Sequence, residues 1–210
     1  MSRLPWWSAA LVIVLVLPAR VALATVGGPT LCDVLGFDAT TKRVYVHFEP
    51  HNEGDDFGDV MYFPLGTSAA GRLVPVSWNR SGEGSSMDTT LLSRLRKLRA
   101  TLKPLRGQAA AAMPWQLEVL ARDTTSDVDG APRFRLRATF RDAGPYEVTA
   151  YHVPSINRIA VLEIPGRSER VVVFSYIGDS SEGGYETQVP ILVLAGEKGT
   201  RVVEGGRFAR

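Results

Sequence analysis

The stretch RVVVFSYI, residues 170–177, is apolar at most positions, and QVPILVLA, residues 188–195, has the same character a short distance later. Both are rich in Val, Ile and other residues that favour the pleated surface of a β-strand. A strand with one face in water alternates apolar and polar residues, whereas these two segments are apolar on both faces. We therefore expect them to lie centrally in the fold. Pro190 has no N–H to donate, so its strand should begin near that residue or carry a bulge there.

Other strand-like segments have one apolar and one polar face. In RVYVHFE (43–49), every second residue from Val44 to Phe48 is apolar, and the alternate residues form a polar face that we expect in water. The gaps between most neighbouring segments are short, which favours antiparallel pairing because parallel strands need long crossover connections. The predicted strands span residues 31–37, 43–49, 58–64, 72–78, 114–122, 133–141, 145–152, 157–164, 170–177 and 188–195.

One segment, SSMDTTLLSRLRKLRATLK at residues 85–103, has helical periodicity. Its leucines recur at the spacing that places them on one side of a helix. Ser86 or Asp88 can cap the N-terminus, and Pro104 ends the segment. We predict a helix over about residues 88–103 that packs its leucines on the sheet, with binding to a membrane surface or a partner as the alternative. The leucine stripe consists of Leu91, Leu92, Leu95, Leu98 and Leu102.

These patterns predict an α+β protein that is predominantly β. An antiparallel sheet is expected to curl into a sandwich or an open barrel, with one amphipathic helix packed on it. The chain shows no clean domain boundary. Residues 25–210 are therefore expected to form a single β-rich domain in which the helix is an insertion.

The N-terminal segment has the composition of a secretory signal. Arg3 precedes an uninterrupted apolar run over residues 9–17, and ALA at residues 22–24 provides the small-residue pattern of a cleavage site. The run is about half of the roughly 20 residues that a spanning helix needs, so an uncleaved anchor is the less favoured alternative. We expect cleavage after Ala24 and export of residues 25–210 to the periplasm or the outside of the cell.

The expected mature chain is electrically balanced. The whole sequence has 24 Lys and Arg residues and 22 Asp and Glu residues, and its first 24 residues contain two arginines and no acid. Residues 25–210 thus carry 24 − 2 = 22 basic and 22 acidic side chains. Proteins built mainly to bind nucleic acid are strongly basic, so we expect no nucleic-acid partner.

Two basic segments are candidate binding surfaces. RFRLRATFR, residues 133–141, places its arginines on the face opposite Phe134 and Leu136. One interpretation is the solvent face of a strand, neutralised by acids on neighbouring strands such as Glu118. The other is that this strand and the predicted helix form one cationic surface for an acidic protein or an anionic envelope component. The candidate residues are Arg94, Arg96, Lys97, Arg99, Arg133, Arg135 and Arg137.

The most polar stretch, EPHNEGDDFGD at residues 49–59, is a candidate metal site. Calcium takes about six to eight oxygen ligands, and this loop carries several carboxylates, although without the spacing of an EF-hand. His47 and His51 are four residues apart, which suits zinc on a helix, but this segment is predicted as strand and loop. A hairpin loop in solvent is the plainer interpretation, and acidic turns at residues 124–130 and 178–184 offer further carboxylates. The candidate ligands are Glu49, His51, Glu53, Asp55, Asp56 and Asp59.

Signals for catalysis are weak. The three histidines, His47, His51 and His152, are not accompanied by a G-x-S-x-G nucleophile elbow, and no phosphate-cradling or dinucleotide glycine pattern occurs. Cys32 is the only cysteine, which excludes an internal disulfide. We expect it to be a small buried residue, with a bridge to another chain as the alternative.

The sequence therefore favours an exported, non-catalytic binding or interaction protein of the cell envelope that uses the cationic surface and no cofactor. The expected partner is an unknown protein or an anionic envelope component, and membrane contact is expected only through a signal segment that is not cleaved. The alternative is a secreted or periplasmic hydrolase, or an ion-dependent module, with a metal such as calcium at residues 49–59.

Overall fold

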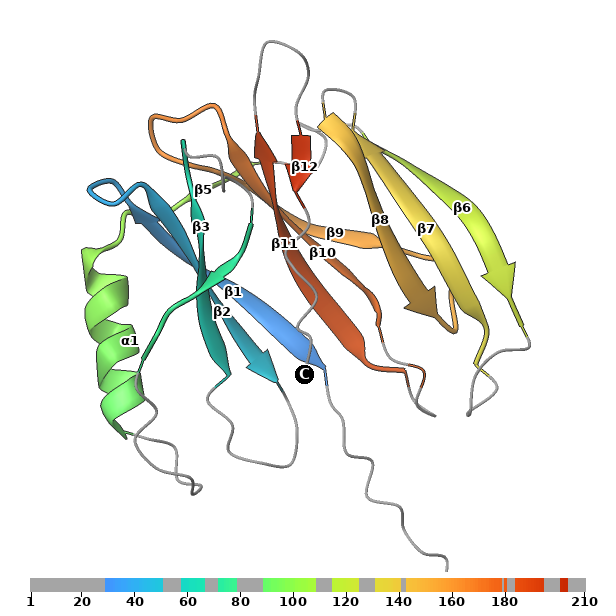
Figure 1. Cartoon of the computed structure of the whole chain (residues 1–210), viewed down its shortest axis with the longest axis horizontal. Helices are drawn as coiled ribbons and strands as arrows, with labels where there is room; N and C mark the ends of the chain where they lie inside the picture. The colour runs from blue at the N-terminus through green and yellow to red at the C-terminus, as the bar shows by residue number, and fades with distance from the viewer. Residues whose placement is uncertain are drawn as a thin grey trace, which may run out of the picture.

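The computed structural model is predominantly β, with one helix in the described part of the chain, which confirms the predicted α+β class (Figure 1). The structure describes residues 29–50, 58–66, 72–78, 89–108, 115–124, 131–140, 143–178, 180, 184–194 and 201–203. Its elements are β1 (Thr30–Asp38), β2 (Arg43–Pro50), β3 (Asp59–Pro64), β4 (Val74–Pro75), α1 (Thr89–Thr101), β5 (Arg106–Gln108), β6 (Trp115–Asp123), β7 (Arg133–Phe140), β8 (Ala143–Tyr151), β9 (Asn157–Glu163), β10 (Arg170–Ile177), β11 (Glu186–Leu194) and β12 (Arg201–Val203).

Most strands belong to one large sheet, in the order β4-β3-β2-β1-β11-β10-β9-β5, and β12 also pairs with β11. A separate small sheet has the order β6-β7-β8. Strand pairs are antiparallel except for β1 and β11, which run parallel at Thr30 and Thr187. The large sheet is therefore mixed. Its one parallel pair, β1 and β11, joins strands that are far apart in the chain. The many residues between them provide the long connection that parallel pairing needs.

Strands β9, β10 and β11 form a central layer, and its apolar strands β10 and β11 are covered on both sides, as their composition predicts. On β10, Val172 and Phe174 belong to one apolar cluster. The alternate residues, Val171 and Val173, belong to a second cluster on the opposite face. All four are at most 3% exposed. Each face of this layer therefore requires a covering layer of its own.

Pro190 lies inside β11, opposite Val173 of β10, so the expectation that it starts the strand or marks a bulge is wrong. The other side of β11 pairs with β1 at Thr187 and with β12 from Leu192 onward. Pro190 occupies the interval between these two pairings. A residue without an N–H is tolerated there because that side of β11 has no ladder partner among the described strands.

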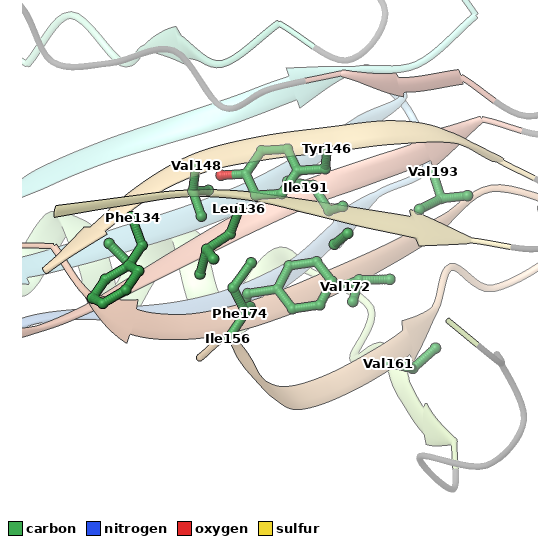
Figure 2. Packing of buried hydrophobic residues seen from close by; sticks show 12 residues of the cluster. Phe134, Leu136, Tyr146, Val148, Ile156, Val161, Val172, Phe174, Ile191 and Val193 are labelled. Atoms are coloured by element: carbon green, nitrogen blue, oxygen red, sulfur yellow. The ribbon is translucent and has the colours of Figure 1, made fainter. Parts of the chain in front are cut away.

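The small sheet covers one face of the central layer. Figure 2 shows side chains of β7 and β8 meeting those of β10 and β11. The Tyr146 ring stacks on Phe174 with 5.9 Å between centroids, and the Trp115 ring lies 5.6 Å from the same phenylalanine. The buried cluster comprises Phe134, Leu136, Ala138, Tyr146, Val148, Ala150, Ile156, Val161, Val172, Phe174, Ile191 and Val193.

The other face of the central layer is covered by β1, β2 and β3. Val44, Val46 and Phe63 of these strands are completely buried against β10 and β11. On the outer face of the same strands, Leu95 of α1 packs against Leu35 and other residues of a third cluster. The order of layers is therefore α1, then β1–β3, then β9–β11, then the small sheet, and Figure 1 shows α1 and the small sheet at opposite ends.

The end of α1 meets β1 at a close approach that requires a glycine. Gly36 has a φ of 145°, and a Cβ there would lie 2.7 Å from Leu102 Cβ and 2.9 Å from the Lys103 carbonyl oxygen. Beside it, the N–H of Phe37 donates to Lys103 O at 2.8 Å, and the N–H of Lys103 donates to Phe37 O at 2.9 Å. These two hydrogen bonds fix the end of the helical segment to the strand.

We expect Gly36→Ala to lower the free energy of unfolding by about 1–3 kcal/mol, because the new methyl group forces α1 away from β1 and strains the backbone. The matched control is Gly107→Ala in β5, where an added Cβ meets nothing within 4 Å. Urea unfolding of both variants measures the difference. Equal stability of the two variants would show that α1 does not depend on this close approach.

Candidate functional site

Strand β7 carries the arginine stripe of the predicted cationic surface. Leu136 and Ala138 of this strand are completely buried in the core. Arg133 and Arg135, on the alternate positions, are exposed. The alternation of the sequence therefore corresponds to one core face and one solvent face. Whether the solvent face can bind an anion depends on which of its arginines are paired with carboxylates.

Carboxylates on both neighbouring strands pair with these arginines. The register places Arg137 opposite Glu118 of β6 and Glu147 of β8. Arg137 Nη2 lies 2.7 Å from Glu147 Oε1, and Nη1 lies 3.5 Å from Glu118 Oε2. Arg133 Nη2 lies 4.0 Å from Asp123 Oδ2. The hydrogen bond with Glu147 raises the pKa of Arg137 above its ordinary value, so this arginine stays charged and paired.

Arg135 is the exception in the stripe. It lies opposite Ala121 and Thr149, and no carboxylate among the described residues forms an ion pair with it. A single unpaired arginine between two paired ones gives this face little net charge. The arrangement favours the interpretation of the stripe as the solvent face of a strand.

Helix α1 has a different charge pattern. Its sequence TTLLSRLRKLRAT contains four basic residues and no acid. Arg99 forms an ion pair with Asp33 of β1, which ties the helix to the sheet. The other three, Arg94, Arg96 and Lys97, are exposed, and no carboxylate in the described part of the chain pairs with them. We call these three residues the α1 cationic face.

The two sets of basic residues do not join into one surface. Figure 1 shows α1 and β7 at opposite ends of the layered structure, with β1–β3 and β9–β11 between them. The reason is that α1 covers the outer face of β1–β3, whereas β7 covers the far face of the central layer. The expected single cationic surface is therefore two separate groups. Among the described residues, Arg94, Arg96 and Lys97 of the α1 group have no carboxylate partner, whereas Arg99 pairs with Asp33.

The candidate metal loop lies mostly outside the described residues. His51, Glu53, Asp55 and Asp56 belong to that part, as do most residues of the two further acidic turns. Glu49 and Asp59 are described, and both are exposed. Within the described ranges, no group of three or more His, Cys, Asp or Glu side chains could hold a metal ion. The metal site at residues 49–59 stays a prediction.

His47 of β2 is a buried polar residue, and its face of the strand was expected in water. It is 3% exposed, and its Nδ1 lies 3.2 Å from Glu49 Oε1. Tyr45, two residues earlier, is 7% exposed. Tyr45 is covered because it packs in the cluster that Leu95 of α1 forms on this face with Leu35 and Val60. Apolar Val60, which lies opposite His47 on β3, and the leucine stripe of the helix were the available signal for this burial.

Cys32 packs against the apolar cluster between β1–β3 and the central layer. Its N–H donates to Gln188 Oε1 of β11 at 3.1 Å, which extends the contact between β1 and β11 beyond the pair at Thr30. Burial raises the pKa of the Cys32 thiol well above its usual value, and the charge of Asp33 raises it further. A thiol held in this way is a poor nucleophile because the reactive form is the thiolate.

In comparisons with known proteins, no family model, no curated protein and no solved structure matches this chain. Among the described residues, no helix has both the length and the apolarity needed to cross a bilayer.

We expect Cys32 to react much faster with a disulfide reagent such as DTNB after unfolding than in the folded protein, because its raised pKa keeps it protonated at pH 8 and the thiolate is the reactive form. Labelling is followed by absorbance with and without denaturant. Complete labelling of the folded protein within the mixing time would contradict the burial of this thiol.

Proposed function

We propose that this chain is an exported, non-catalytic binding protein of the cell envelope, and that it holds an anionic envelope component on the α1 cationic face. The observation that carries the proposal is the exposure of Arg94, Arg96 and Lys97 without paired carboxylates among the described residues. The arginines of β7 serve as an internal comparison, because that strand recruits acids from both neighbours.

The helix is held so that its basic side chains stay in solvent. Leu91 and Leu95 are buried, and the ion pair between Arg99 and Asp33 adds a polar attachment to β1. The leucine stripe is therefore occupied by the sheet, and the cationic face remains available. A surface fixed in advance binds with less loss of conformational entropy than a mobile segment.

The chemistry of the face suits phosphate or carboxylate groups. A guanidinium presents several donors in a planar fork that matches these anions, and a lysine adds a compact charge. Exposed charges of this kind attract a polyanion strongly at low ionic strength and weakly once salt screens them. The signal-like sequence of residues 1–24 supports export, which would bring the helix to the anionic polymers and headgroups of an envelope.

The test compares two triple variants that each remove three positive charges. One is Arg94→Gln, Arg96→Gln, Lys97→Gln on α1, and the other is Arg133→Gln, Arg135→Gln, Arg137→Gln on β7. Binding to linear polyphosphate is measured over a salt series. We expect the α1 variant to lose affinity and to lower the slope of log affinity against log salt by roughly 0.7–0.9 for each lost contact. The β7 variant should retain the wild-type slope.

Equal losses in both variants, or no binding by the wild type, would overturn the proposal. A thermal-shift series in chelator, calcium and zinc accompanies the salt series. A ligand of the folded state at a hundredfold excess over its dissociation constant stabilises by about 2.7 kcal/mol. A shift with calcium or zinc alone would favour the ion-dependent module at residues 49–59 instead.

A further inference from the structure

Strand β6 is an edge strand whose apolar face is incompletely covered. Among the described strands it pairs only with β7. Leu117 is 39% exposed and Val119 is 50% exposed, which makes them two of the three large exposed hydrophobic residues in the described chain. The strand contains neither proline nor lysine, the residues that commonly protect a sheet edge. Within the described ranges, the edge of β6 away from β7 thus has no strand beside it, and apolar side chains lie along it.

The exposed pair belongs to the core-facing side of the small sheet. The register places Leu117 opposite Ala138 and Val119 opposite Leu136, and both of these β7 residues are completely buried. The apolar surface of the small sheet therefore continues past the central layer that covers it. Exposed apolar surface next to an open sheet edge marks a site of strand addition.

The first five residues of β6 are complementary to an antiparallel copy of themselves. When Leu117 lies opposite the same residue of a second chain, Trp115 lies opposite Val119 on either side of it, and all of these side chains share the apolar face. On the other face Gln116 lies opposite Glu118, so an amide meets a carboxylate and no like charges meet. Apolar and aromatic pairs of this kind stabilise antiparallel sheets.

The rest of β6 restricts pairing to this segment. The register with β7 shifts between Val119 and Ala121, and beyond this bulge Arg122 lies over Phe134 on the core-facing side, 5.6 Å from its ring centroid. A bulge and an inward-facing charge both block edge pairing. A pairing centred on Glu118 would bring two carboxylates together, and one centred on Val119 would run through the bulge. The register centred on Leu117 avoids both.

We propose that two copies of this chain pair through Trp115–Val119 of β6, antiparallel about a two-fold axis at Leu117. The two small sheets then form one continuous six-stranded sheet. The contact is self-complementary and uses the same edge of both chains, so it closes at the dimer. It leaves the α1 cationic face uncovered, because α1 lies at the other end of the molecule (Figure 1).

The register is tested by cysteine cross-linking. Residues directly opposite in an antiparallel pair have Cα atoms roughly 4.5–5.5 Å apart, within the range of about 4.4–6.8 Å that a disulfide spans. We expect Leu117→Cys to form covalent dimers on oxidation. Val119→Cys is the register control, because each Val119 lies four residues from its copy, about 13–14 Å along the strand. Val153→Cys, at a site 44% exposed on the β8–β9 corner, is the exposure control.

The wild-type chain, whose single cysteine is the partly buried Cys32, is the blank in this experiment. A yield of disulfide dimer at least tenfold higher for Leu117→Cys than for both controls supports the proposal. A yield no higher than that of Val153→Cys overturns the interface, and a higher yield for Val119→Cys overturns the register.

A second measurement does not depend on oxidation. Sedimentation of the wild type should show a monomer–dimer equilibrium, and Leu117→Arg should raise the dissociation constant at least tenfold. Val153→Arg adds the same charge at another exposed apolar site and should leave that constant unchanged. Circular dichroism confirms that both variants fold. A wild type that is monomeric at about 100 μM, a concentration at which even weak specific pairs associate, overturns the proposal.

Discussion

The structure depends on a central layer whose main strands, β10 and β11, are apolar and buried on both faces. Val172 and Phe174 of β10 face one way and Val171 and Val173 the other, and all four are essentially inaccessible. The hydrophobic effect therefore demands two covers for one layer. One cover comes from β1–β3, which precede α1, and the other from β6–β8, which follow β5. This demand places β1–β3 and β6–β8 in opposite outer layers.

The two groups of basic residues differ because of this arrangement. The arginines of β7 lie in the middle strand of a three-stranded sheet, where Glu118 and Glu147 approach Arg137 from either side. The outer surface of a helix on an outer layer is not flanked by strands, and α1 contributes no acid of its own. Of the basic residues of α1, only Arg99, which lies next to β1, forms an ion pair among the described residues, with Asp33. The positive charge of Arg137 on β7 is thus neutralised by neighbouring carboxylates, whereas that of Arg94 and Arg96 on α1 has no carboxylate partner among the described residues. Position in the layers, more than sequence composition, decides which arginines have carboxylate partners among the described residues.

Local periodicity was sufficient to predict the central strands, the helix and the two-faced strand β7, since each of these follows from residues within one segment. The burial of Tyr45 and His47 could not be predicted in this way, because their strand alternates as a half-exposed strand does. The cluster that buries Tyr45 is formed by residues from other elements, α1 among them. Pro190 illustrates the same limit: its place inside β11 depends on two strands from distant parts of the chain. In the candidate site, the arginines could be identified from the sequence. Their carboxylate partners could be identified only from the strand register of β6, β7 and β8.

The junction between β1 and β11 has a consequence for the order of folding. The contact from Cys32 to Gln188 joins residues that are 156 positions apart, whereas β1–β3, β6–β8 and β9–β11 each form from consecutive strands. Long loops are slower to close than short ones, so the three local units should assemble before β1 meets β11. During synthesis the apolar inner face of β1–β3 therefore waits, uncovered, until the last third of the chain has emerged. A chaperone that shields one sheet for that interval would determine how much of the protein reaches its native state.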